Sequence, residues 1–225
     1  LALGAALCEG GAARNLLAMA SSHFCAAERQ FRTPLSYGAV RTPTAQWTAT
    51  AAGCCLLQPQ GEGVGIAAAT FGRVQDYQVK DINNMGAAMA PAAASTLLHY
   101  FKDTGTEPQE FDCIYTGDLG QVGSQLLREL LAAEGLLIKN HVDCGCILFD
   151  ANEQSVKSGG SGPGCCAAVL CGHILPRLRR GSQKRVLFTA TGALMSQTTF
   201  LQKESIPAIA HLVELRSPQQ KEENG

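Results

Sequence analysis

The sequence has no apolar run of the roughly 18 residues that a membrane-spanning helix needs. Its N-terminus also lacks the charged segment, the apolar core and the cleavage site of a secretory signal. We therefore expect a soluble protein that is not secreted. The chain starts at Leu1 rather than Met, inside a stretch with the apolar spacing of a helix. We accordingly expect a fragment that lacks residues upstream.

An excess of positive charge is lacking as well. Lys and Arg number 18 against 19 Asp and Glu, which gives a formal net charge of −1. The basic residues are scattered apart from the short run 177–180, which suits the end of a helix because cations are stabilised there. The chain therefore shows no electrostatic footprint for DNA or RNA, and we expect no nucleic-acid partner.

Metal-ligand spacing is missing despite ten cysteines. The adjacent pairs at 54–55 and 165–166 lie in apolar runs, as small buried thiols do in a reducing compartment. Cys144 and Cys146 are separated by one residue instead of the two of a zinc knuckle, and no second pair matches them. We expect free thiols and no structural metal site.

The sequence is rich in hydrophobic residues and in glycine. With 225 residues, of which 46% are hydrophobic, the chain can bury the core of one large domain or of two fused halves. Four glycines within positions 159–164 predict a tight turn between the stretch 146–149, predicted to be extended, and an apolar helix. The amides of such a turn favour an anion. The glycines can equally serve the close packing of a corner, and both interpretations stay open.

Polar residues stand at the exits of predicted strands. The apolar run 15–20 predicts a buried parallel strand, and His23 follows it. The run 111–115 predicts another strand, followed by Asp118, which either caps the next helix or faces a ligand. Because ligands of open α/β sheets collect at strand exits, His23, Asp118 and the turn 159–162 should converge in one cleft.

One internal repeat can be read directly. Residues 11–21 and 181–191 share a glycine, small or polar residues, a basic residue and an apolar strand that ends in a hydroxyl side chain. A further strand follows each copy, at 47–57 in the first and 208–215 in the second. The repeat predicts a duplicated α/β unit in which the apolar strands of the two copies are central and adjacent. The stretch 47–57 is also predicted to form an antiparallel hairpin with 65–74.

Five separated segments resemble the stage V sporulation protein AD family, whose members have the thiolase fold. The resemblance runs from the first residue to about Arg216. The segments are residues 21–32, 41–48, 83–93, 116–120 and 204–207. The resemblance implies an α/β fold with α-β-α-β-α layers from two duplicated halves, the first truncated at its N-terminus. It assigns 1–80 to the remainder of the first half, 81–216 to the second half and 217–225 to a disordered tail.

The same resemblance implies a role in endospore formation. Members of the family bind dipicolinic acid and, with membrane proteins of the SpoVA group, support its loading into the spore as the calcium chelate. For this chain we expect dipicolinic acid as ligand, SpoVA-group proteins as partners, no cofactor, a cytoplasmic location peripheral to the spore inner membrane, and a homodimer by analogy. The implied ligand-binding residues are His23, Cys25, Asp118, Asp143, Cys144, Lys157, Gly159, Gly160, Ser161 and Gly162.

Acyl transfer is the alternative function. The superfamily's nucleophilic cysteine would lie upstream of Leu1, and the positions of its bases fall near Gly117 and at 143–144. None of these can activate a thiol, so we expect binding without turnover. A working acyltransferase would instead need Cys25 as nucleophile and His23 as base, with no evident acid to orient that base. Packing at the edge of a loop is the simpler interpretation of both residues.

Overall fold

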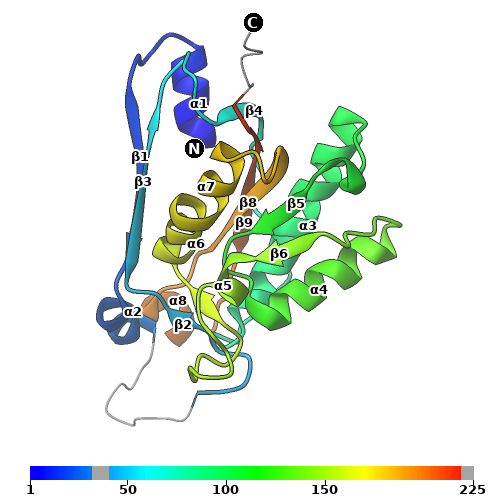
Figure 1. The fold of residues 1–225 in the computed structure, drawn as a ribbon. Helices are drawn as coiled ribbons and strands as arrows, with labels where there is room; N and C mark the ends of the chain where they lie inside the picture. The colour runs from blue at the N-terminus through cyan, green and yellow to red at the C-terminus, as the bar shows by residue number, and fades with distance from the viewer. Residues whose placement is uncertain (32–40, 219–225) are drawn as a thin grey trace, which may run out of the picture.

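A computed structural model describes residues 1–31 and 41–218 (Figure 1). It contains a five-stranded mixed sheet with helices on both faces and, beside it, a separate two-stranded sheet. A short parallel pair joins β2 (Trp47–Thr48) to β7 (Gly160–Ser161). Within the described ranges, no helix has both the length and the apolar character to cross a bilayer. The tail expected over 217–225 falls outside these ranges from residue 219 onward.

The five-stranded sheet has the order β4-β9-β8-β5-β6. Strand β5 is parallel to both of its neighbours, whereas β9 is antiparallel to β8 and to β4. The helix α8 (Gln197–Leu201) lies in the connection between β8 and β9. The strands are β4 (Gly65–Thr70), β5 (Cys113–Thr116), β6 (His141–Asp143), β8 (Arg185–Ala193) and β9 (Ala208–Arg216).

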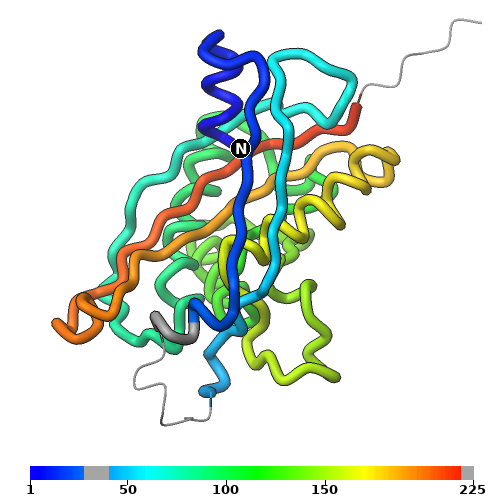
Figure 2. Tube along the Cα trace, turned by 90° about the vertical axis from the view of Figure 1, so that its left-hand side faces the viewer, coloured from blue at the N-terminus to red at the C-terminus, as the bar shows by residue number. Residues whose placement is uncertain are grey.

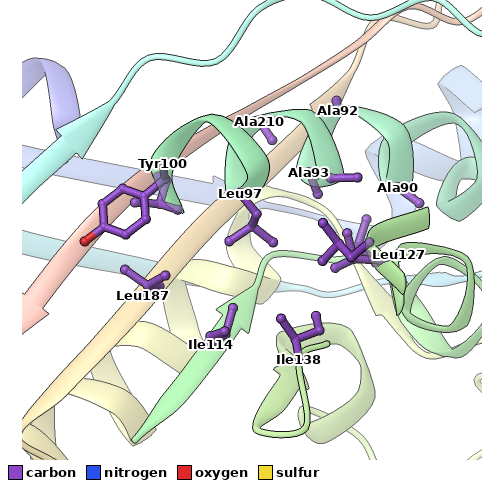
Figure 3. Close-up of a cluster of buried hydrophobic side chains, with 14 of the residues drawn as sticks. Ala90, Ala92, Ala93, Leu97, Tyr100, Ile114, Leu127, Ile138, Leu187 and Ala210 are labelled. Carbon is purple, nitrogen blue, oxygen red and sulfur yellow. The ribbon is translucent and has the colours of Figure 1, made fainter. Parts of the chain in front are cut away.

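Alternate residues of this sheet enter two separate cores. Ile114 and Leu187 pack with α3 and α4 on one face (Figure 3), and Tyr115 and Phe188 pack with α6 and α7 on the other. Because successive side chains of a strand point to opposite faces, a sheet covered on both sides requires the continuous apolar runs seen in β5 and β8. The covering helices are α3 (Met85–Thr104), α4 (Gly120–Ala133), α6 (Pro163–Val169), a π-helical turn (Leu170–Ile174) and α7 (Leu175–Arg179).

The ends of α3 follow from its flanking residues. The Asn84 side chain accepts a hydrogen bond from the amide of Ala87 at 3.2 Å, which satisfies one of the donors that a helix start leaves free. Gly105 ends the helix in the left-handed conformation, with φ of 66°. Between these caps, Leu97 and Tyr100 point from α3 into the first core (Figure 3).

The two-stranded sheet consists of β1 (Leu16–Ser22) and β3 (Ala51–Leu57) in antiparallel register, preceded by α1 (Ala2–Glu9). The two strands run side by side in front of α6 and α7 in Figure 2. α6 packs so closely on β3 that a Cβ at Gly53 would lie 2.5 Å from the carbonyl oxygen of Ala167. The inner face of this small sheet is therefore covered by a helix, while Leu17 and Met19 on its outer face are exposed.

Two expectations about strand pairing are wrong. The strand 15–20 was expected to be central and adjacent to the strand 186–190, but β1 pairs with β3 and its residues alternate between half-buried and exposed. An apolar run does not reveal whether one face or both are covered. The hairpin between 47–57 and 65–74 is also absent from the described structure, because the chain crosses after β3 to the other sheet, where β4 pairs with β9.

The internal repeat itself is visible in the backbone. Gly11 and Gly181 both adopt left-handed φ, at 72° and 70°, directly after α1 and α7. The same four backbone hydrogen bonds close both caps. In the first they run from Gly10 to Ala6, Gly11 to Cys8, Ala12 to Leu7 and Ala13 to Leu7; in the second from Arg180 to Pro176, Gly181 to Leu178, Ser182 to Arg177 and Gln183 to Arg177. Each cap leads into a strand, β1 or β8, that pairs antiparallel with a later strand.

The segment before the glycine-rich turn differs from the expectation. Residues 146–149, predicted to be extended, belong to the short helix α5 (Cys144–Ile147) and the turn after it. The cause is Asp143, whose side chain accepts from the amide of Gly145 at 2.9 Å and caps the helix. α6 begins at Pro163, and proline suits the first helical position because its missing amide proton is not needed there.

Candidate functional site

A cavity of about 490 Å³, called the main cavity below, lies where several strands end. It is bordered by the end of β1 and the start of α2 (Phe24–Phe31), by the segment before β2, and by the start of α3. The loop after β5, the glycine-rich turn and the end of β8 complete it. Strand exits from both sheets thus supply one site, which is the general expectation for α/β layers.

The predicted convergence of His23, Asp118 and the turn 159–162 in one cleft is confirmed in part. His23, Asp118, Ser161 and Gly162 all line the main cavity. The other six residues expected to bind the ligand do not line the main cavity. Cys25 and Lys157 are exposed, Gly159 and Gly160 are buried in the turn behind the lining, and Asp143 and Cys144 are buried on the far side of the loop that carries Asp118.

Asp118 is the central polar group of the main cavity. Its Oδ2 accepts from the amide of Gly162 at 2.7 Å, and its Oδ1 accepts from the hydroxyl of Thr191 at 2.9 Å. Only 8% of the residue is exposed, and this burial raises the pKa of its carboxyl, an effect that the two hydrogen bonds oppose. The alternative role as helix cap is wrong, because the first amides of α4 donate to other side chains, Gly120 to Asp143 and Val122 to Ser158.

The glycine-rich turn therefore already binds a carboxyl group of the protein. The amide of Gly162, with φ of 93°, is used by Asp118, and the amide of Gly164 donates to the hydroxyl of Ser22 at 3.0 Å. Close packing is the second use of the same glycines, since a Cβ at Gly164 would lie 2.2 Å from the carbonyl oxygen of Ala51. The packing interpretation is confirmed, whereas binding of a ligand anion by the turn stays a prediction, because the amide of Gly162 is directed at a side chain of the protein.

Asp143 supports this arrangement without reaching the main cavity. Its carboxylate accepts four hydrogen bonds, from the hydroxyl of Thr116 at 2.6 Å and from the amides of Leu119 at 3.0 Å, Gly120 at 2.9 Å and Gly145 at 2.9 Å. Burial raises its pKa to about 7, while these hydrogen bonds pull the pKa down. Asp143 thus fixes the loop next to Asp118 and is a positioning residue.

Gln46 is a site residue that the sequence patterns did not single out. Its Nε2 donates to the carbonyl oxygens of Asp118 at 2.6 Å and Gly160 at 2.9 Å, so it ties the loop after β5 to the glycine-rich turn. The next residue, Trp47, pairs with Gly160 in the short parallel pair. The guanidinium carbon of Arg41 lies 3.9 Å from the centroid of the Trp47 ring. The only sequence signal for Gln46 is its position inside the segment 41–48 that resembles the family.

The cysteines bear on acyl transfer, because a thiol nucleophile needs a base within reach. No cysteine lines the main cavity, and none of the described His, Cys, Asp and Glu side chains form a group that could hold a metal ion. Burial raises the pKa of Cys166 to about 12 and also raises the pKa of Cys165, which favours the protonated, poorly nucleophilic form of both thiols. Cys25 is exposed on α2, outside the cavity in which His23 lies.

Residues 1–216 match the family described as Stage V sporulation protein AD (SpoVAD). The chain belongs to the stage V sporulation protein AD family. Stage V sporulation protein AD of Bacillus subtilis (strain 168) is 43% identical to it over 212 residues, which cover 94% of the chain and 62% of that relative. The chain thus spans less than two thirds of the length of this SpoVAD protein.

Solved structures show that this SpoVAD chain has a thiolase-like fold. 3-Oxoacyl-[acyl-carrier-protein] synthase III from Aquifex aeolicus VF5 matches with a TM-score of 0.53 at 12% identity, over 95% of the chain and 61% of the synthase. The tetronic acid condensing enzyme AbyA1 matches with a TM-score of 0.55 at 14% identity, over 96% of the chain and 63% of that enzyme. At such identities the likeness carries the fold alone.

Proposed function

We propose that this SpoVAD protein binds dipicolinic acid in the main cavity without converting it, and so supports uptake of the compound into the developing spore. The observation that carries the proposal is a cavity with Asp118 and the glycine-rich turn at its wall and no cysteine in its described lining, in a chain of this family. A fold that other proteins use for condensation is here proposed to serve recognition.

The dimensions and chemistry of the main cavity suit a flat aromatic dicarboxylate. Its volume of about 490 Å³ lies within the range of roughly 300–1,000 Å³ usual for small-molecule sites. Ile82, Met85 and Met89 provide apolar wall for a ring, and Asn83 and Ser161 provide donors for carboxylates. Apolar walls with a few convergent polar groups are the usual composition of such a site.

The charge of Asp118 bears on the form of the ligand. A dicarboxylate next to ionised Asp118 meets a like charge, and such a repulsion grows as the site excludes water. Lys157, the one basic side chain other than His23 among the expected ligand-binding residues, is exposed and outside the described lining. We therefore propose that calcium supplies the compensation and that the calcium chelate is the form bound at this site.

Two further parts of the proposal concern assembly. We propose that the full-length protein acts beside membrane proteins of the SpoVA group at the periphery of the spore inner membrane, and that it forms a homodimer. Membership of the family supports the first part, and the thiolase-like fold supports the second by analogy. Co-purification with SpoVA-group proteins from sporulating cells tests the first, and sedimentation of the purified full-length protein tests the second.

Calorimetric titration of the full-length protein with dipicolinate, with and without calcium, tests the central proposal. We expect saturable one-site binding that is tighter with calcium. A parallel assay with acyl-thioester substrates is expected to show no thiolase or ketoacyl synthase turnover. Absence of binding under both conditions would overturn the proposal, and turnover would restore the acyltransferase alternative.

A further inference from the structure

A second cavity, of about 390 Å³, lies beside the sheet edge formed by β6. One face of α4, strand β6 and the helix α5 build it, and it shares none of its described lining residues with the main cavity. Arg128 and His141 both line it, together with Gln121 and Ser124. Two basic side chains therefore border one hollow outside the site already described.

The hydrogen bonds of His141 define its tautomer. Thr116 donates its only hydroxyl proton to Oδ2 of Asp143 at 2.6 Å, and the same hydroxyl oxygen lies 2.8 Å from Nε2 of His141. When Asp143 is ionised, Nε2 therefore carries a proton and donates to Thr116. In the neutral ring Nδ1 is then a bare acceptor, and it is buried without a hydrogen-bond partner among the residues described. A buried polar atom left without a hydrogen-bond partner destabilises the folded protein, and a ligand that supplies the partner removes that penalty.

Arg128 is the second basic group of this cavity. Its residue is exposed, and in the described chain its guanidinium makes no hydrogen bond and no ion pair. Burial, followed by the charge of Arg128, lowers the pKa of His141 to about 4. Arg128 and a protonated His141 would repel each other across this cavity. A bound anion would offset that repulsion, because it attracts both groups.

The nearby carboxylates do not fill this role. Asp143 lines the cavity, but its oxygens accept from Thr116 and from three backbone amides. On α4, Glu129 accepts from Gln125 at 2.9 Å. Neither carboxylate is paired with Arg128, so the guanidinium is left for a ligand.

We propose that the second cavity binds a small oxyanion, a carboxylate or a phosphate group, between Arg128 and His141. Arg128 offers a bidentate fork, the imidazole takes up a proton at Nδ1 and becomes a second donor, and the side chains of Gln121 and Ser124 complete the shell. Through Thr116 and Asp143 the bound anion is linked by hydrogen bonds to the loop that carries Asp118.

Titration of the full-length protein with inorganic phosphate, followed by the ring resonances of His141, tests this site. At neutral pH and constant ionic strength, we expect phosphate to move these resonances toward their protonated positions with saturation. A parallel titration with acetate separates carboxylate from phosphate recognition. Sodium chloride is the control, and an equal response to chloride would overturn the proposal.

Charge-matched variants locate the anion. Arg128→Gln is expected to weaken the phosphate response roughly tenfold or more, because it removes charge-assisted hydrogen bonds. Lys139→Gln, which removes an exposed positive charge just before β6, is expected to leave the affinity within about twofold, since surface charges contribute little. Arg128→Lys keeps the charge and should restore binding in part. A full response in Arg128→Gln, or an equal loss in Lys139→Gln, would refute the assignment.

Discussion

Asp118 shows how a single residue can occupy the place that a glycine-rich turn offers to a ligand. Its carboxylate accepts from the amide of Gly162 at 2.7 Å, so the protein supplies its own anion to that turn. A ligand carboxylate has either to compete with this side chain or to bind beside it with a compensating cation. In its ionised form, Asp118 would therefore make binding of a dicarboxylate more dependent on calcium.

Asp118→Asn tests that dependence. The substitution removes the negative charge but leaves one donor of the pair Gly162 and Thr191 facing an amide group, which should lower the free energy of unfolding by about 1–3 kcal/mol. We expect the ratio of dipicolinate affinities with and without calcium to shrink, as measured by calorimetry. Asp103→Asn, an exposed carboxylate near the end of α3, is the control and should leave the ratio unchanged.

Gly160→Val is a second test at the residue scale. A Cβ at Gly160 would lie 3.1 Å from the ring of Phe149 and 3.2 Å from Sγ of Cys165, so a branched side chain must displace the turn from β2. We expect dipicolinate binding to be abolished in Gly160→Val and weakened less in Gly160→Ala. Cys25→Ala should bind like the wild type. Equal loss in Cys25→Ala would bring the exposed thiol back into the site.

At the scale of the helices and strands, features determined by neighbouring residues could be predicted from the sequence, and features determined by long-range packing could not. The Asn84 cap of α3 and the start of α6 at Pro163 each depend on residues within a few positions, so a local sequence pattern is enough to predict them. The partner of β1 is set by the packing of α6 on the small sheet, which no local pattern encodes. The bond from Gln46 to Gly160 spans 114 residues and was missed for the same reason.

The contact between β3 and α6 can be tested with a pair of glycines. Gly53→Ala places a Cβ 2.5 Å from the carbonyl oxygen of Ala167, so the helix must move away from the strand. Overpacking of this kind should lower the free energy of unfolding by about 1–3 kcal/mol. Gly172→Ala, in the helical turn after α6 with no atom within 4 Å of the new Cβ, should instead be neutral or stabilising by up to about 1 kcal/mol. Urea denaturation of both variants decides the matter, and equal stabilities would contradict the tight contact.

At the scale of the whole molecule, the stability of the protein at low pH depends on Glu214, a buried carboxylate in the five-stranded sheet. This residue of β9 is 2% exposed and accepts hydrogen bonds from Tyr100 on α3 at 2.5 Å and from Arg185 on β8 at 2.7 Å. Burial alone would raise its pKa, but the hydrogen bonds from Arg185, Tyr100 and Arg216 prevail and lower it to about 2. The charged form of Glu214 therefore belongs to the folded state.

The sign of the pH dependence follows from that depressed pKa. The contribution of Glu214 to stability is fully present above its unfolded pKa of 4.5 and is lost as the pH falls toward about 2. The shift corresponds to at most about 3 kcal/mol. Denaturation curves at pH 6 and pH 3 should show that Glu214→Gln is less stable than the wild type at pH 6 and that this gap narrows at pH 3. A gap that stays constant would mean that the carboxylate contributes nothing as a charge.

The matching helix ends at Gly11 and Gly181 allow the same substitution to be made at two equivalent places in one chain. Both glycines have the same backbone geometry, and a Cβ at either would meet no atom within 4 Å, so alanine there imposes the same local strain twice. One copy leads into the small sheet and the other into the large one. Comparing the two alanine variants therefore measures cooperativity: equal losses mean that both sheets melt in one transition, and a smaller loss at Gly11 means that the region around β1 and β3 unfolds as a unit of its own.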